Sequence, residues 1–428
     1  MKIAFVFPPQ WCPHTDSSLQ LWNRAVTTRL AKTCDVDVYY SATISPSKKG
    51  LIDGVNYRRV FSRWEHRLVK MVYLMHLKMG IRRPLFSTDL WFPGYALGVA
   101  IQLRKNKADI IHVYNFPQYA ALIKHFNPAA KVVLNMHGEL LTQVKFANVR
   151  ARLSRMAHII SCSDLLTNGI RARFPEFADR CVTVPMGILL EAFDRFDQVD
   201  RAEPSKRVLC VTRLSPEKGP HVLVDAFNLI AQRYPDATLT IVGPEGVSPR
   251  GDIADLCLGR DLVDSFEPFY RGNYLNLLKQ RVAPQAASRA KFTGLIPHEE
   301  VYNYYAKSDI YVSPTFYESF GMSIIEAMAA GLPVIACRGG AVTDFIIDGQ
   351  NGLLVDVGDA SGLADAVGRL ISDPALGRSL AVSAKQMVRK NYSWDKIASS
   401  LMDVYRGVRH DSPEVAEEVA ELRPIPNR

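Results

Sequence analysis

Residues 318–326, ESFGMSIIE, place two carboxylates around a Phe-Gly pair, just before the apolar run AMAAGLPVIAC. Their pattern predicts a helix that begins near Ser319 and ends before Gly331, because Ser is a favourable N-cap and Pro333 prevents continuation. The first turn of a helix has backbone N–H groups without intrahelical partners, and these groups bind anions. Gly321 would let a ligand approach the backbone closely. The stretch therefore indicates a phosphate-binding turn; the alternative is that Gly321 only eases helix packing.

Two carboxylates in one stretch also suggest a glycosidase, but their spacing argues against that function. On one helix, Glu318 and Glu326 would lie about 12 Å apart along the axis. Retaining glycosidases need about 5–5.5 Å between the carboxyl groups, and inverting ones about 6.5–9.5 Å. We therefore expect separate roles, with Glu318 beside the phosphate-binding turn and Glu326 two turns further along. Each could accept hydrogen bonds from hydroxyls of one extended ligand.

Two further groups of polar residues follow predicted strands. In VTRLSPEKG, Arg213 and Lys218 flank a turn, and a guanidinium and an ammonium group together suit a diphosphate. In KVVLNMHGEL, His137 ends a strand and precedes a glycine. Loop cations and lone histidines are often structural. Ligands of parallel α/β sheets bind at the carboxyl ends of strands, however, so these positions favour a functional role.

The elements that would position these residues alternate between short apolar runs and longer helical segments. The runs that predict strands are KIAFVF, DVDVYY, DIIHVY, KVVLNM, HIIS and CVTV in the first half, and RVLCVT, ATLTIV, KFTG, DIYVS, PVIAC and GLLV in the second. Continuous apolar strands separated by helices are typical of parallel sheets covered on both faces. The predicted fold class is α/β, with two doubly wound, Rossmann-like domains facing an interdomain cleft. A polar join near residues 190–205 separates domain 1–195 from domain 196–392.

The composition is that of a globular protein. The chain has 428 residues, of which 48% are hydrophobic and 22% charged. Its seven cysteines are an odd number without a CxxC pair, which predicts a reducing compartment and neither disulfides nor a zinc site. The N-terminus is predicted as a first strand and not a signal peptide, and no apolar run reaches the roughly 18 residues of a transmembrane helix. These features predict a cytoplasmic protein.

Charge is spread unevenly along the chain. Residues 1–190 hold 26 Lys and Arg against 11 Asp and Glu, and the remainder holds 26 against 32. The two parts therefore carry formal charges of +15 and −6, which add to the +9 of the whole chain. Such asymmetry suggests that the first part meets an anionic surface or substrate, although drift in surface composition would give the same pattern. No nucleic-acid recognition motif accompanies the basic part.

Three segments depart from the α/β pattern. Residues 62–79 predict a basic amphipathic helix, whose apolar face either packs on the core or binds a membrane. That face consists of Trp64, Leu68, Met71, Val72, Met75 and Met79. Residues 246–290 are predicted as an insertion that could contact a ligand or another subunit. Residues 410–428 are predicted as a short acidic tail.

The stretch PTFYESFGMSIIEAMAAGLPVIA, with VTRLSPEKG upstream and MHG in the first half, resembles glycosyltransferase family 4. The resemblance extends from KIAFVFPP through DGQNGLLV to YSWDKIA. It implies a GT-B fold and a retaining hexosyltransferase-type enzyme with a UDP- or GDP-linked sugar as donor. It also implies a metal-independent front-face mechanism, with no cofactor beyond the donor substrate. The expected acceptor is a lipid-linked saccharide or a cell-surface polysaccharide precursor, and the expected location is the cytoplasm or, as a peripheral protein, the inner face of the membrane.

The resemblance implies a role for each matched residue. His137 and Glu318 would act at the transferred sugar. The donor would be held by Arg213, Lys218, Phe320, Gly321, Met322, Ser323 and Glu326. The nucleobase side would be formed by Gly294, Leu295 and Ile296, and an acceptor-side loop by Asp16, Ser17 and Ser18. A C-terminal helix over about residues 393–409 would pack back onto the first domain.

The sequence departs from the family pattern in two places, and three alternatives stay open. Asp16, Ser17 and Ser18 stand where many members have Gly-Gly, and Pro185-Met186-Gly187 stands for Pro-Asn-Gly. Asp35-Val-Asp37 resembles a DxD metal motif but falls inside a predicted strand, so we interpret it as structural. The alternatives are a sugar-nucleotide epimerase, a phosphorylase, for which no pyridoxal lysine is evident, and a catalytically silent subunit that binds sugar or a partner.

Overall fold

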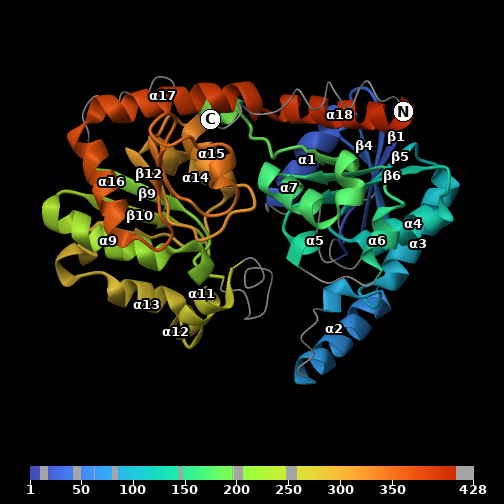
Figure 1. The fold of residues 1–428 in the computed structure, drawn as a ribbon, viewed down its shortest axis with the longest axis horizontal. Helices are drawn as coiled ribbons and strands as arrows, with labels where there is room; N and C mark the ends of the chain where they lie inside the picture. Colours follow the sequence, from blue (N-terminus) through green and yellow to red (C-terminus); the bar gives the residue numbers. More distant parts are fainter. Residues whose placement is uncertain are drawn as a thin grey trace. The chain divides into compact units, whose positions relative to one another are not determined.

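A computed structural model describes residues 1–9, 18–41, 50–61, 63–79, 85–143, 148–194, 196, 206–246 and 258–410. The chain divides into two compact units. Unit 1 contains Met1–Met186 and the segment that begins at Trp394, and unit 2 contains Gly187–Ser393 (Figure 1). The predictions for Asp16, Ser17 and the tail after residue 410 lie outside the described residues.

Unit 1 is built on an eight-stranded sheet in the order β3-β4-β2-β1-β5-β6-β7-β8. Its strands are β1 (Lys2–Val6), β2 (Asp35–Ser41), β3 (Gly50–Ile52), β4 (Val55–Val60), β5 (Ile110–Tyr114), β6 (Lys131–Met136), β7 (His158–Ser161) and β8 (Cys181–Thr183). All pairs are parallel except β3 with β4. The apolar runs predict six of these strands. They miss β3, which is three residues long, and β4, whose sequence VNYRRV interrupts the apolar pattern with two arginines.

The helices of unit 1 cover both faces of this sheet. They are α1 (Ser18–Leu30), α2 (Arg63–Lys78), α3 (Pro93–Asn106), α4 (Pro117–Phe126), α5 (Leu140–Gln143), α6 (Val149–Leu153), α7 (Asp164–Arg173) and α18 (Trp394–His410), with 3-10 turns η1 (Leu85–Ser87) and η2 (Pro175–Arg180). The connection from β1 to β2 and the connections from β5 to β8 run in opposite directions along the sheet. Right-handed crossovers therefore place α1 on one face and α4 and α7 on the other.

The C-terminal helix α18 belongs to unit 1 and packs against α1. At its start, Asp395 accepts a hydrogen bond from Arg29 of α1 at 2.9 Å. Further along, the Tyr405 hydroxyl lies 2.7 Å from His112 Nδ1, and both residues are fully buried. The predicted helix over residues 393–409 is therefore present, and it completes the core of the unit formed by the start of the chain.

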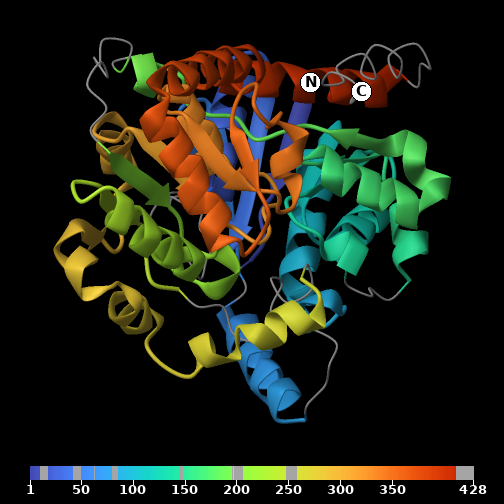
Figure 2. The ribbon, with the colours of Figure 1, turned by 60° about the vertical axis from the view of Figure 1, so that its left-hand side comes forward.

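Unit 2 is built on a six-stranded, all-parallel sheet in the order β11-β10-β9-β12-β13-β14. Its strands are β9 (Arg207–Val211), β10 (Thr238–Val242), β11 (Ala290–Phe292), β12 (Ile310–Ser313), β13 (Val334–Cys337) and β14 (Leu353–Val355). Each strand falls within a predicted apolar run except β11, which begins one residue before the run KFTG. Both units are thus Rossmann-like sheets between helices, all-parallel in unit 2 and parallel except for β3 in unit 1, and the α/β fold class predicted from the sequence is confirmed (Figure 2).

The helices of unit 2 include two that start directly beside candidate site residues. The α-helices are α8 (Glu191–Asp194), α9 (Pro220–Arg233), α11 (Arg260–Ser265), α12 (Glu267–Tyr270), α13 (Tyr274–Arg281), α14 (His298–Ala306), α15 (Met322–Ala329), α16 (Ala360–Ser372) and α17 (Pro374–Asn391). The 3-10 turns are η3 (Pro216–Lys218), η4 (Pro284–Arg289) and η5 (Ala341–Asp344). Helix α9 follows Lys218, and α15 follows the Phe-Gly pair.

The described part of the predicted insertion is helical and packs on α9. Residues 258–289 form α11, α12, α13 and η4. Tyr274 of α13 is fully buried and its hydroxyl lies 2.7 Å from His221 Nδ1 of α9. Arg281 forms a two-point ion pair with Asp225, with both contacts at 2.6 Å. The segment is therefore part of the core of unit 2.

Candidate functional site

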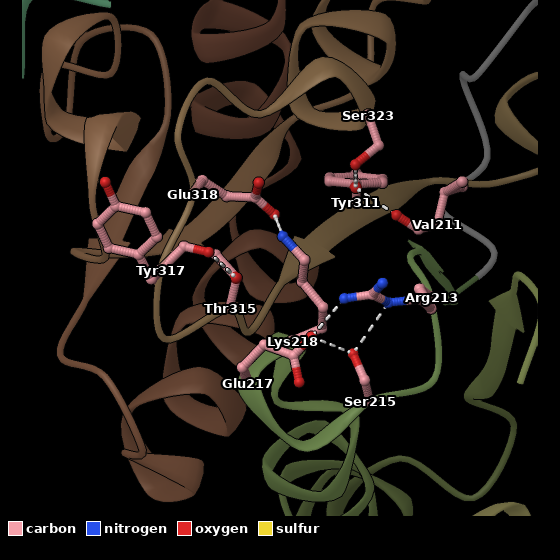
Figure 3. A network of polar contacts seen from close by, with 10 residues as sticks. All are labelled: Val211, Arg213, Ser215, Glu217, Lys218, Tyr311, Thr315, Tyr317, Glu318 and Ser323. Carbon is pink, nitrogen blue, oxygen red and sulfur yellow. Dashed lines mark hydrogen bonds and ion pairs between the residues drawn. The ribbon is translucent and has the colours of Figure 1, made fainter. Parts of the chain in front are cut away.

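Lys218 and Glu318 meet in unit 2, although 100 residues separate them in the chain. The Lys218 ammonium donates to Glu318 Oε1 at 2.7 Å (Figure 3). Lys218 ends the turn after β9, and Glu318 lies in the loop after β12, the neighbouring strand in the sheet. The parallel sheet thus brings two predicted site residues together at the carboxyl ends of adjacent strands, as ligand sites in this fold class require.

The backbone of Glu318 is fixed by a pair of glycines after β13. Its N–H donates to the Gly339 carbonyl at 3.3 Å, and its carbonyl accepts from Ala341 N at 2.7 Å. Gly340 has a φ of 67°, and a side-chain carbon there would lie 2.2 Å from the Glu318 carbonyl oxygen. Only glycine permits this approach. This bridge also explains why residue 319 does not begin a helix, because the neighbouring backbone is extended.

Helix α15 begins at Met322, so the predicted start near Ser319 is wrong. The N-cap is Gly321, in a left-handed conformation with a φ of 101°, and it forms no side-chain cap hydrogen bond. Glu318 therefore precedes the helix, and only Glu326 lies on it. The end of the helix at Ala329 agrees with the prediction. The first N–H groups of α15 have no intrahelical partner by the geometry of a helix, so Gly321, Met322 and Ser323 present an N-terminus for an anion.

Phe320 does not present its side chain for ligand binding. It is buried, and its ring packs against Phe345 and Tyr392 with centroid distances of 6.1 Å and 5.8 Å. The Ser323 hydroxyl accepts a hydrogen bond from Tyr311 at 2.8 Å (Figure 3). Burial, with smaller effects from Cys210 and Glu318, raises the pKa of Tyr311 well above its usual value, so this donor stays protonated. The aromatic residues therefore position the turn.

Arg213 is held by its own partners on the loop after β9. Its guanidinium donates to Glu217 Oε1 at 2.6 Å and to the Ser215 hydroxyl at 3.3 Å (Figure 3). Ser215 also donates to Glu217 Oε1, at 2.6 Å, and both residues are buried. The side chain of Arg213 is 43% exposed, so it remains accessible to solvent despite these two partners. Glu217 thus sets the direction of Arg213, a role that the sequence pattern does not reveal.

Glu326 is almost fully buried and both of its carboxylate oxygens are engaged. Oε1 lies 3.0 Å from His298 Nε2, and Oε2 accepts from the Tyr305 hydroxyl at 2.9 Å. Both partners come from α14, with His298 as its first residue. A carboxylate oxygen can accept more than one hydrogen bond, so Glu326 can also bind a hydroxyl. His298 and Tyr305 could not be predicted from the sequence, because nothing in IPHEEVYNYYA marks them as partners of a residue 20 or more positions away.

The three residues predicted on the nucleobase side form the loop between β11 and α14. The Gly294 carbonyl accepts from Gly243 N at 3.2 Å, which ties this loop to the end of β10. Leu295 is 78% exposed, and Ile296 is partly buried. Since α14 starts at His298, the loop leads directly to the partner of Glu326. The loop is therefore linked to Glu326 through His298, which follows Ile296 by two residues.

His137 lies at the carboxyl end of β6 in unit 1. Its backbone N–H donates to Asn115 Oδ1 at 2.9 Å, and its ring stacks on Tyr114 with centroids 5.8 Å apart and meets Trp22 edge-on at 5.5 Å. Burial lowers the pKa of His137 to about 3. The imidazole is therefore neutral at physiological pH, with one nitrogen able to donate and the other to accept. Ser18 of the predicted acceptor-side loop is the first residue of α1.

Asp37 of the DxD-like sequence has a structural role, as the sequence analysis expected. It is buried within β2, where it accepts from Asn56 at 2.9 Å and pairs with Arg58 at 2.9 Å and Lys2 at 3.5 Å. It therefore ties β2 to its neighbours β1 and β4. Within the described ranges, no group of three or more His, Cys, Asp or Glu side chains is placed to hold a metal ion.

Comparisons with known proteins agree with this arrangement. Residues 192–389 match the family model described as "Glycosyl transferases group 1". The chain is 26% identical over 301 residues to the GDP-mannose-dependent alpha-(1-6)-phosphatidylinositol monomannoside mannosyltransferase of Mycolicibacterium smegmatis, covering 66% of this chain and 71% of that protein. It is 25% identical over 404 residues to spore coat protein SA of Bacillus subtilis, covering 91% and 94%.

The fold is shared with solved structures. The Anabaena protein Alr3699/HepE, solved in complex with UDP, superposes with a TM-score of 0.68 at 17% identity, covering 95% of this chain and 100% of that one. The two-sheet architecture is the GT-B fold expected from the sequence resemblance. The matched family region lies within unit 2 and includes Arg213, Lys218, Glu318 and Glu326.

Proposed function

We propose that the chain, whose residues 192–389 match the family model of group 1 glycosyl transferases, is a retaining, metal-independent enzyme of glycosyltransferase family 4. It would transfer a hexose from a UDP- or GDP-linked sugar to a saccharide acceptor. The observation that carries this proposal is the 2.7 Å contact of Lys218 with Glu318 directly before the N-terminus of α15. A cation, a carboxylate and a positive helix end then lie in one place, which suits a sugar diphosphate.

Charge development explains how these groups would promote the reaction. When the sugar–phosphate bond breaks, negative charge grows on the leaving nucleoside diphosphate. The Lys218 ammonium, the Arg213 guanidinium and the N-terminal dipole of α15 are fixed positive groups that stabilise this charge. Removing one such preorganised donor typically lowers kcat by about 10²–10³-fold. These three groups can carry the role that a divalent cation has in other transferases.

The carboxylates would bind hydroxyl groups of the donor. Glu318 would accept hydrogen bonds from the transferred sugar, and Glu326, held by His298 and Tyr305, from the ribose. We assign His137 to the transferred sugar, since a neutral imidazole suits a hydroxyl better than a phosphate. In a front-face displacement the acceptor oxygen attacks from the side of the leaving group, and no enzyme side chain forms a bond to the sugar. Isolation of a covalent glycosyl-enzyme would contradict this mechanism.

The donor base can be identified from thermal unfolding. The intact chain would be melted with UDP, GDP, ADP or TDP, each with and without magnesium. A ligand at 100 times its Kd adds about 2.7 kcal/mol to the stability of its site. We expect stabilisation by UDP or GDP that does not require magnesium. The Mycolicibacterium relative is named for GDP-mannose, and the Anabaena structure contains UDP, so both bases have a precedent.

Two variants make this test specific. Glu326→Ala should abolish most of the stabilisation, whereas Glu299→Ala, which removes an exposed carboxylate from the first turn of α14, should keep it. If no nucleotide stabilises the intact chain, the protein is instead a silent subunit that binds sugar or a partner. A relative named for its place in a spore coat shows that this outcome must be tested.

The acceptor that the charge distribution favours is presented at an anionic membrane. Residues 1–190 carry a formal charge of +15, which attracts such a surface. We propose a lipid-linked saccharide or a cell-surface polysaccharide precursor, used at the inner face of the membrane by a peripheral enzyme. Among the described residues, no helix is both long and apolar enough to cross a membrane. Transfer to lipid-linked saccharides in vesicles, compared with the same saccharides free in solution, tests this acceptor class.

A further inference from the structure

Helix α2 contacts unit 1 through the side of the helix that carries Glu65, His66 and Val69. On that side, the Glu65 carboxylate accepts hydrogen bonds from Gly94 N at 2.5 Å and Tyr95 N at 2.7 Å, and so caps α3. His66 Nε2 lies 3.2 Å from the Ser41 hydroxyl, and its ring meets Phe92 at 4.6 Å. Val69, one turn further on, is buried. These contacts fix the rotation of the helix about its axis.

The opposite side of α2 is an apolar stripe that faces solvent. Trp64, Leu68, Met71 and Met75 repeat at i, i+4, i+7 and i+11 and therefore share one side of the helix. Trp64 is 82% exposed, and the other three are each more than half exposed. Met79, directly after the helix, is 69% exposed. The alternative that this face packs on the core is therefore wrong. Figure 1 shows α2 extending away from the sheet of its own unit.

Positive charge lies beside the stripe. Arg67 and Lys70 are exposed, and neither pairs with a carboxylate among the described residues. The Arg67 guanidinium lies 5.8 Å from the centre of the Trp64 ring. Glu65 is the one acidic residue of the helix, and its carboxylate is occupied at the start of α3. The exposed sides of α2 thus combine apolar and basic residues without an accessible negative charge.

We propose that α2 is an interfacial helix that binds an anionic lipid bilayer. Trp64, Leu68, Met71 and Met75 would enter the boundary between headgroups and acyl chains, while Arg67 and Lys70 bind lipid phosphates. The 16-residue helix is about 24 Å long, so it would lie in the plane of the interface. This surface would bring the enzyme to a lipid-linked acceptor. Binding of α2 to the bilayer does not depend on the proposed function; only the link to the acceptor rests on it.

A second copy of the chain is a less suitable occupant of the stripe. A symmetric contact through α2 would bring the same basic side chains of both copies together. A bilayer with anionic lipids instead pairs these charges with phosphates and accepts Trp at the headgroup level. Charge complementarity thus selects the anionic bilayer.

The test is co-sedimentation of the full chain with vesicles of phosphatidylcholine alone, or of equimolar phosphatidylcholine and phosphatidylglycerol. We expect binding to the second kind and at least tenfold weaker binding to the first.

Arg67→Gln with Lys70→Gln should weaken binding to the anionic vesicles about 25-fold, since one basic residue near an anionic surface contributes about fivefold. Trp64→Ser with Met71→Ser should weaken it by at least tenfold on either membrane. The matched control, Arg104→Gln with Lys105→Gln, removes two exposed cations from the end of α3 and should change binding less than twofold.

A second readout follows Trp64 itself. Brominated phosphatidylcholine should quench part of the tryptophan fluorescence of the bound chain, and Trp64→Phe should remove that part. The inference would be overturned if the intact chain did not bind vesicles or if all variants bound them equally. It would also be overturned if the Trp64 variant lost a dimer but kept its vesicle binding. Nucleotide stabilisation distinguishes the two proposals. Vesicle binding without any nucleotide effect leaves α2 as an interfacial helix on a protein that is not the proposed transferase.

Discussion

The Lys218 ammonium and the Glu318 carboxylate form an ion pair of 2.7 Å within unit 2. The residue predicted to hold the diphosphate is thus in contact with the residue predicted to hold the sugar. Both side chains are less than a quarter exposed. In this partly buried position, each charge of the pair neutralises the other. If a donor binds, the Lys218 ammonium would contact both its phosphates and the Glu318 carboxylate.

Replacement of Lys218 by Gln should weaken both folding and donor binding. Glu318 would lose a charged hydrogen bond, which costs about 1.5–3 kcal/mol of unfolding free energy. UDP or GDP should bind at least about tenfold more weakly, which corresponds to 1.4 kcal/mol. Urea unfolding and nucleotide titration measure the two effects. The control is Lys206→Gln, because Lys206 forms an ion pair of the same length with exposed Asp236; it should cost about 0–1 kcal/mol and leave nucleotide binding unchanged. Equal behaviour of the two variants would contradict a role for Lys218 in the site.

We expect the Tyr305 hydroxyl to contribute more to stability than the hydroxyl of Tyr304, its neighbour on α14. Tyr305→Phe leaves Glu326 Oε2 without its 2.9 Å donor in a buried place, so we expect a loss of about 1–3 kcal/mol of stability. Tyr304→Phe, one residue away and partly exposed, should cost less than about 0.5 kcal/mol. His298→Ala should raise the Kd for the nucleotide with little change in kcat at saturation, because His298 contacts Glu326, which is proposed to bind the ribose and not the transferred sugar. A large fall in kcat with an unchanged Kd would show that His298 acts elsewhere.

Gly340 should tolerate no side chain. Gly340→Ala would place a carbon 2.2 Å from the Glu318 carbonyl oxygen and so displace the loop that carries Glu318. We expect more than about 3 kcal/mol of destabilisation, or a folded protein without activity. Gly349→Ala is the matched control: Gly349 has a similar φ of 72°, but nothing lies within 4 Å of the added carbon. It should cost only the left-handed strain of about 1–2 kcal/mol. Thermal unfolding and turnover distinguish the two, and similar losses would mean that the close contact is unimportant.

The stability of unit 2 should fall as the pH is lowered through the range below neutrality. Burial, with a smaller effect from Arg281, lowers the pKa of His221 to about 3, whereas an unfolded histidine titrates near 6.5. Between these values the unfolded chain binds a proton that the folded chain does not, so stability rises with pH. From pH 7.5 to pH 5, His221 alone accounts for about 2 kcal/mol. His221→Gln should lose part of this dependence in urea unfolding. An unchanged slope would show that His221 does not control it.

The strands could be predicted well from sequence, because buried parallel strands are continuous apolar runs. IIHVY of β5, which is buried at all five positions, is typical. β3 and β4 were beyond this pattern: β3 pairs only with β4, and β4 lies beside β2, where Asp37 meets Asn56 and Arg58 only in the folded sheet. The α/β fold class and the glycosyltransferase class were both predicted and are confirmed.

Sequence motifs predicted single residues of the candidate site but not the contacts between them. ESFGMSIIE and RLSPEKG point to Glu318 and Lys218, and the sheet brings them together. The partners Glu217, His298 and Tyr305 carry no signal of their own, because their roles depend on contacts between segments that only the fold aligns. The start of α15 was misplaced by three residues for the same reason, since a distant glycine pair keeps Glu318 extended. The assigned roles of the site residues stay predictions.

The position of α18 has a consequence for biosynthesis. Unit 1 is made from the first 186 residues and from a helix that follows unit 2 in the chain. During translation, the whole of unit 2 therefore emerges from the ribosome before α18 is available. Unit 2 can finish folding while the sheet of unit 1 still lacks the helix that places Tyr405 against His112. A nascent chain arrested before residue 394 would carry a completed unit 2 and an unfinished unit 1, whose exposed apolar surface would make the chain prone to aggregation until the last helix arrives.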